Sequence, residues 1–199
     1  MSTAKENAQQ KTTIELPRRA FIFDSARTAL SATAVALLGG YASLGKAAGA
    51  EQPADTANDV SILTEALSAE REAVAAYQLG AESGLLHPGV LKVALQFQGH
   101  HEKHGDLLAS AISDFGGRVP TSVTDYSFPT DSLKQQKDVL AFAASLERSA
   151  VSAYVGAIPL FINRDLSKAA ASILADEAMH WAVLRQALGL APVPGAFFS

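Results

Sequence analysis

Four long segments of the chain alternate apolar and polar residues with the period of an α-helix. They cover residues 58–83, 88–115, 131–158 and 165–188. Within each segment, apolar residues recur three and four positions apart, which places them on one helical face. Gly84, Gly116 and Gly189 end three of the segments, and Pro159 ends the other. No segment has the two-residue period of a strand, so the pattern predicts an all-α chain of four helices.

The connections between these helices differ in length. The first and third are short, whereas residues 116–130 contain two glycines together with Pro120 and Pro129. Two antiparallel neighbours do not need so long a connection, but a chain that crosses the length of a bundle does. We therefore expect a four-helix bundle of two antiparallel helix pairs joined by one long crossover.

The first and third predicted helices carry the same motif. At an offset of 77 residues, eight of twelve positions agree without a gap between residues 66–77 and 143–154. The second and fourth helices agree less well, although His104 aligns with His180. This repeat indicates one helix pair used twice, with two halves related by pseudo-symmetry. A site between the halves would draw residues from both.

Six side chains with oxygen or nitrogen donors fall near the middle of these helices. They are Glu70, His101, His104, Glu147, Glu177 and His180. Glu177 and His180 are three residues apart, so both leave the same helical face about one turn apart and can bind one ion. An unpaired carboxylate on an apolar face is costly to bury, so it favours a nearby cation. The pattern predicts a metal site at mid-height in the bundle.

This order of motifs resembles the ferritin-like di-metal carboxylate proteins, in which single Glu residues on two helices and a Glu-x-x-His on each of the others hold two iron or manganese ions. Glu70 and Glu147 match the single carboxylates. Glu177 and His180 match one Glu-x-x-His, and His104 matches the histidine of the other. The resemblance implies a ferritin-like four-helix bundle that binds iron or manganese.

The sequence departs from that family pattern at His101, where the pattern has a bridging Glu. An imidazole neutralises less of the charge on two divalent ions than a carboxylate does. Three alternatives therefore stay open: a di-iron site, a mononuclear iron site, or zinc, since imidazole suits several first-row metals. The adjacent Glu102 points about 100° away on the helix and ligates only if the helix is distorted.

Two classes of function fit this site. In the first, the protein is a metalloprotein, with oxidation of the metal or consumption of oxygen or peroxide as its reaction, which would make it a metal-dependent oxidoreductase of the oxidative stress response. In the second, it is a non-enzymatic envelope stress or interaction protein, in which the inner polar residues pair without a metal. Tyr77 and Tyr154, each seven residues after its Glu, favour core packing with a satisfied hydroxyl over a role beside the metal.

The first fifty residues predict an export signal. Arg18-Arg19 precede an apolar stretch at 28–44, and Ala48-x-Ala50 follows it. This order resembles a twin-arginine signal cleaved after Ala50, which implies the twin-arginine translocation machinery as a partner and a periplasmic or otherwise exported domain. The stretch is near the roughly 18 residues that span a bilayer. Its Gly, Ser and Thr content makes it a poor span, so we expect no stable membrane anchor.

Charge and composition narrow the partners further. Residues 1–50 hold six Lys/Arg against three Asp/Glu, whereas residues 51–199 hold ten against seventeen, and the chain has no cysteine. An acidic domain lacks the basic surface that nucleic acid requires, so we expect no nucleic-acid partner. The absence of cysteine excludes metal sites with thiolate ligands. Homodimerisation is an expectation from the frequency of symmetric dimers alone. The predicted organisation is a signal peptide at 1–50, a linker at 51–57, the bundle at 58–188 and a Pro/Gly/Phe tail at 189–199.

Overall fold

The computed structural model describes residues 53–121 and 125–198, and the predicted signal peptide lies outside this part of the chain. Four α-helices account for most of it: α4 (Pro53–Glu82), α5 (Pro88–Asp114), α6 (Gln136–Ala157) and α7 (Arg164–Ala187). Two short 3-10 turns, Thr130–Ser132 and Ile158–Leu160, precede and follow α6. The described residues contain no strand, which confirms the all-α prediction.

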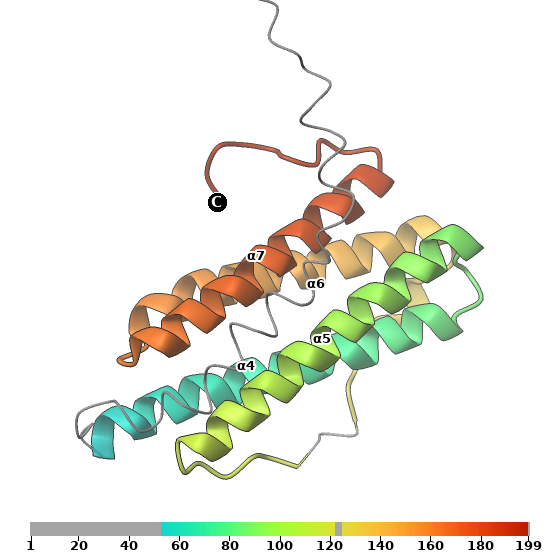
Figure 1. The fold of residues 1–199 in the computed structure, drawn as a ribbon. Helices are drawn as coiled ribbons and strands as arrows, with labels where there is room; N and C mark the ends of the chain where they lie inside the picture. Colours follow the sequence, from blue (N-terminus) through green and yellow to red (C-terminus); the bar gives the residue numbers. More distant parts are fainter. Residues whose placement is uncertain (1–52, 122–124, 199) are drawn as a thin grey trace, which may run out of the picture. The chain divides into compact units, whose positions relative to one another are not determined.

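The helices pack as two pairs. α4 lies along α5 and α6 lies along α7, with a further contact between α4 and α6 (Figure 1). The link within each pair is short, whereas residues 115–135 join the pairs. This arrangement is the predicted bundle of two hairpins with one long crossover. Among the described helices, none has the length and apolarity needed to span a membrane.

α4 begins earlier than the sequence pattern predicted. Its first residue is Pro53, so most of the predicted linker at 51–57 is helical. Proline is favoured at the first helical position because its missing N–H would have no partner there, and Asp55 in the first turn suits the helix dipole. Asp59 therefore lies inside the helix. It is buried and accepts hydrogen bonds from the backbone N–H groups of Ile162 and Asn163, which join α4 to the link before α7.

α6 begins later than predicted. The segment Thr130–Ser132, where the helix was expected to start, is a separate 3-10 turn. The helix starts at Gln136 because Gln135 and Asp138 form a capping box, in which each side chain accepts from the other's backbone N–H. The capping residue was not a Ser or Asp, so the usual signal was missing from the sequence.

The core consists of two apolar clusters with a polar layer between them. One cluster contains Leu63, Leu67, Leu108, Ile112, Tyr154, Phe161, Leu166, Ala170 and Ile173. The other contains Tyr77, Phe97, Leu140, Ala144 and Leu184. Each helix passes from one cluster to the other, and at the change every one of them presents a Glu or His. The polar layer is therefore near the middle of the bundle, as predicted.

Candidate metal centre

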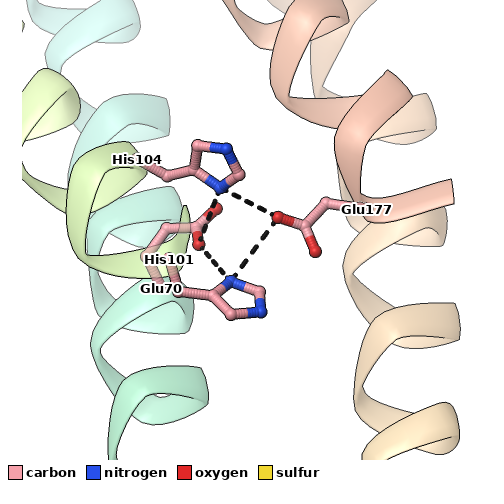
Figure 2. A group of neighbouring side chains, drawn as sticks. All are labelled: Glu70, His101, His104 and Glu177. Atoms are coloured by element: carbon pink, nitrogen blue, oxygen red, sulfur yellow. Dashed lines mark hydrogen bonds and ion pairs between the residues drawn. The ribbon is translucent and has the colours of Figure 1, made fainter. Parts of the chain in front are cut away.

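Three helices bring four of the predicted ligands together on one side of the polar layer. Figure 2 shows Glu70 of α4, His101 and His104 of α5, and Glu177 of α7 pointing toward one another. His101 Nδ1 lies 2.8 Å from Glu70 Oε2 and 3.5 Å from Glu177 Oε1. His104 Nδ1 lies 3.0 Å from Glu177 Oε1 and 3.5 Å from Glu70 Oε2. Two imidazoles and two carboxylates thus surround one point.

A second group adjoins the first and shares two of its members. It consists of His101, Glu147 of α6, and Glu177 and His180 of α7. His180 Nδ1 lies 3.5 Å from Glu147 Oε1 and 3.8 Å from Glu177 Oε2, while His101 Nε2 lies 3.3 Å from Glu147 Oε1. In each group the donor atoms are within 4.8 Å of one another. The structure therefore brings all six predicted site residues together as two adjacent groups of four.

Burial makes this cluster of polar groups unusual. Five of the six residues are at most 3% exposed, and the side chain of His104 is 14% exposed. Several buried atoms of the cluster have no hydrogen-bond partner: His104 Nδ1, Glu147 Oε2, both carboxylate oxygens of Glu177, and His180 Nδ1. Buried polar atoms are nearly always paired, and each exception calls for an explanation such as an ion. The lone pairs of carboxylates and imidazoles are also the donor set that transition metals accept.

The ionisation of the cluster follows from its mutual contacts. Burial raises the pKa of Glu70, but hydrogen bonds and charge from His101 and His104 outweigh it and bring the pKa to about 2. Burial lowers the pKa of the imidazoles, yet the surrounding carboxylates raise the pKa of His101 to about 9 and those of His104 and His180 to about 11. Without a metal, protonated imidazoles therefore supply the positive charge that the carboxylates need.

Two tyrosines tie the halves of the repeat together. Tyr154 of α6 donates its hydroxyl hydrogen to Glu70 Oε1 of α4 at 2.6 Å, and Tyr77 of α4 donates to Glu147 Oε1 of α6. Each tyrosine thus binds the carboxylate of the other half, which is the reciprocal pattern expected of a pseudo-two-fold repeat. Both rings are buried in the core as well. The hydroxyls leave each carboxylate one further oxygen for the cluster.

Asp176 is a site residue that the sequence reading missed. Its Oδ2 lies 3.4 Å from the Nε2 atoms of both His104 and His180, and 2.8 Å from His100 Nδ1. A carboxylate on the outward nitrogen of a histidine fixes the tautomer and leaves the inward nitrogen free to ligate. The four-residue spacing of Asp176 and His180 on one helix was the signal that could have revealed it.

His100 and Glu102, the residues on either side of His101 in α5, differ in whether they reach the cluster. His100 points about 100° away from His101 on the helix, yet its Nδ1 lies 2.9 Å from His180 Nε2 and 2.8 Å from Asp176 Oδ2, both on α7. Glu102 is exposed and belongs to none of the groups. α5 is regular from Pro88 to Asp114, so the distortion that Glu102 would need to reach the cluster is absent from this helix.

Removing one tyrosine hydroxyl tests the link between the halves. We expect Tyr154→Phe to lower the free energy of unfolding of the chelator-treated protein by about 1–3 kcal/mol, because a buried carboxylate oxygen loses its donor. Urea unfolding followed by circular dichroism measures the change. Tyr77→Phe should behave alike, and Tyr126→Phe in the crossover should change little. Equal stability of Tyr154→Phe and wild type would show that the hydroxyl is not a structural link.

Comparisons with known proteins agree with this architecture. The chain is similar to the crystal structure of a conserved hypothetical protein, Rv2844, from Mycobacterium tuberculosis, with 22% identity and a TM-score of 0.62 over 72% of this chain and 99% of that one. It is also similar to ferritin-like, diiron-carboxylate proteins from Bacillus anthracis strain Ames, with 18% identity and a TM-score of 0.58 over 67% and 97% of the two chains. No curated protein matches the sequence. The family model of the ferritin-like domain matches residues 58–190, and the chain therefore belongs to the ferritin-like family.

Proposed function

We propose that this protein is a metalloprotein that binds two transition-metal ions in its polar layer, with iron the first candidate and manganese the second. The observation that carries the proposal is the set of buried nitrogen and oxygen atoms on His104, Glu147, Glu177 and His180 that make no hydrogen bond. Two further facts support it. The cluster divides into two overlapping groups of four, and a structural neighbour is described as a diiron-carboxylate protein.

The two groups share Glu177 and His101, but these residues are not equivalent as shared ligands. Neither oxygen of Glu177 makes a hydrogen bond, and Oε1 lies near His104 while Oε2 lies near His180, so the residue can serve both ion positions. A neutral imidazole has one lone pair, and its other nitrogen carries a proton. His101 can therefore ligate only one ion, and its second nitrogen donates to a carboxylate.

The remaining residues would prepare the cluster for a redox-active ion. Bound iron supplies one-electron exchange, with oxygen or peroxide as the oxidant in the proposed reaction. Tyr77 and Tyr154 each hold one carboxylate oxygen by a hydrogen bond, and Asp176 orients the rings of His104 and His180. The apolar cluster that contains Tyr77, Phe97 and Leu184 covers this layer on one side. Because these contacts fix the donor atoms in advance, little reorganisation is needed on binding.

The competing function is a structural bundle in which the Glu and His residues pair with one another. The hydrogen bond between His101 and Glu70 favours it, as do the raised histidine pKa values. A stable paired network, however, hydrogen-bonds every member, and this one leaves buried atoms on four residues in ion-pair contacts without a hydrogen bond. The metal-binding function accounts for those atoms, so we prefer it.

We also propose that this domain is exported through the twin-arginine route. This proposal is based on the order of Arg18-Arg19, an apolar stretch and Ala48-x-Ala50 in the sequence. The twin-arginine route, as the resemblance implies, carries proteins that are already folded. A site whose ions are inserted during folding would suit that route.

Removing the shared carboxylate tests metal binding. We expect Glu177→Ala to lose most of the metal that wild type takes up anaerobically from iron(II), because it removes the residue that serves both positions. Glu102→Ala is the matched control, since Glu102 is an exposed carboxylate on the histidine-bearing helix. Elemental analysis after gel filtration gives the ions per chain. Wild type without bound iron or manganese, or equal metal in Glu177→Ala and wild type, contradicts the proposal.

Replacing His101 tests the number of ions. We expect His101→Glu to bind two ions more tightly than wild type, since a carboxylate can bridge two positions where an imidazole serves one. His101→Ala should bind fewer ions than wild type, while both variants should keep the helical circular dichroism signal. Anaerobic titration with iron(II), read by optical and magnetic spectroscopy, distinguishes mononuclear from coupled centres. A decrease in ions bound by His101→Glu would show that the imidazole is the better ligand there.

The pH dependence of metal binding follows from the histidine pKa values. Ligation requires neutral imidazoles, whereas His101, with a pKa of about 9, and His104 and His180, with pKa values of about 11, are protonated at neutral pH in the metal-free protein. Metal binding must therefore release protons. We expect the affinity to rise between about pH 6 and pH 9, by as much as about tenfold per pH unit for each proton released. Calorimetric titration with manganese(II) in buffers of different ionisation enthalpy counts these protons, and an affinity independent of pH contradicts the assignment.

A further inference from the structure

A large cavity opens beside the polar layer, at the end of the bundle that holds the first residues of α4. Its volume is about 840 Å³, which is within the range of small-molecule binding sites. The wall comes from α4 between residues 56 and 73, from the first half of α7, and from the second halves of α5 and α6. Most of its side chains are apolar, among them Ile62, Leu63, Ala66, Leu108, Phe161 and Leu166.

The inner end of this cavity is the candidate metal centre itself. Glu70, His101, Glu147 and Tyr154 all line it. The Tyr154 hydroxyl donates to Glu70, and its oxygen keeps lone pairs that can accept one further hydrogen bond. A molecule in the cavity would therefore have its inner end against the oxygen atoms of the polar layer and the rest of its length among apolar side chains.

The sequence repeat does not explain this cavity. If the two halves of the repeat packed identically, the opposite end of the bundle would hold a cavity of the same size. The apolar cavity there measures about 130 Å³. At that end α4 and α6 are close: a Cβ atom added to Gly80 of α4 would lie only 3.2 Å from Val139 Cγ1 of α6. The residues that correspond to Gly80 and Val139 at an offset of 77 are Ala157 and Ile62, and both line the large cavity. One end is packed and its repeat counterpart is open.

The charge around the cavity restricts what can enter it. The exposed side chains of Glu65, Glu72, Asp114 and Asp165 line its outer part. Among the lining residues in the described part of the chain there is no Lys or Arg. The acidic opening repels anions, and burial of any ion among apolar side chains is costly. A neutral molecule with an apolar chain and one small polar group meets neither obstacle.

We propose that this cavity binds a neutral, chain-like apolar molecule, with a hydroxyl or carbonyl at the end that reaches Tyr154 and Glu70. Its role as the substrate of the centre depends on the proposed metal-binding function, but binding itself does not. The cavity thus gives the polar layer a ligand class besides the metal ions. Free fatty acids are excluded from that class by their negative charge.

Calorimetric titration of the purified full chain with two ligands of equal chain length tests the class. We expect octan-1-ol to bind, and octanoate to bind about tenfold more weakly or worse, because its carboxylate loses its hydration in the cavity and the acidic opening repels it. Equal or tighter binding of octanoate overturns the assignment to neutral molecules. If octan-1-ol does not bind, the proposal is wrong. This holds even where gel filtration shows a dimer whose second chain covers the opening.

Two variants that fill the cavity with a larger side chain, and one control variant, test whether the ligand binds there. Ala66→Phe and Ala150→Phe put a ring into the cavity, so we expect each to weaken octan-1-ol binding about tenfold or more, since the displaced chain stays in water. Ala141→Phe on exposed α6 surface should bind as wild type does. Circular dichroism checks folding, and if one filling variant does not fold, the other decides. Unchanged binding in a folded filling variant overturns the proposed location.

Metal content measured on the same samples separates this inference from the proposed function. Filling variants that keep their metal and lose octan-1-ol support both. A wild type that holds metal but binds no octan-1-ol rejects only the ligand site. A wild type that binds octan-1-ol without iron or manganese supports the ligand site and rejects the metal function.

Discussion

The burial of three carboxylates at one level of the bundle is the constraint on which the structure depends. Glu70, Glu147 and Glu177 are almost completely removed from water, and an ionised carboxylate in such a place needs positive charge beside it. Three imidazoles occupy the same layer. They supply that charge while protonated, and in the proposed metal-bound form they lose their protons and a cation supplies it instead. The layer can therefore be held together in two ways, with the same side chains in both.

This layer also organises the rest of the fold. The two apolar clusters lie on either side of it, so each helix buries apolar residues, presents its polar turn, and buries apolar residues again. Tyr77 and Tyr154 cross between the hairpins and bind the carboxylates of the opposite half. The site and the core are consequently one unit, in which the same contacts that orient the carboxylates join the two helix pairs.

The two halves are similar in sequence but not equivalent in structure. His101 stands where the related pattern has a carboxylate, and the packing beyond the polar layer is tight at one end and open at the other. A ferritin-like framework built twice from one hairpin thus has a histidine in place of a carboxylate in one half and a large cavity at one end. Proteins that share a fold differ in function because of such differences in their sites.

The sequence by itself determined the four helices, the long crossover and the six residues of the polar layer. These features depend on local periodicity, and Glu177 with His180 or Glu70 with Tyr77 keep their relative positions whenever the segment is helical. The sequence did not reveal the start of α6 at Gln136, where Gln135 and Asp138 form a cap without the usual residue types. Only the tertiary structure decided that His100 and Asp176 reach the cluster, and that Ile62 and Ala157 line a cavity while Val139 and Gly80 touch. The reason is physical: helical period fixes the direction of a side chain within its own helix, whereas the distance between helices is set by every side chain packed between them.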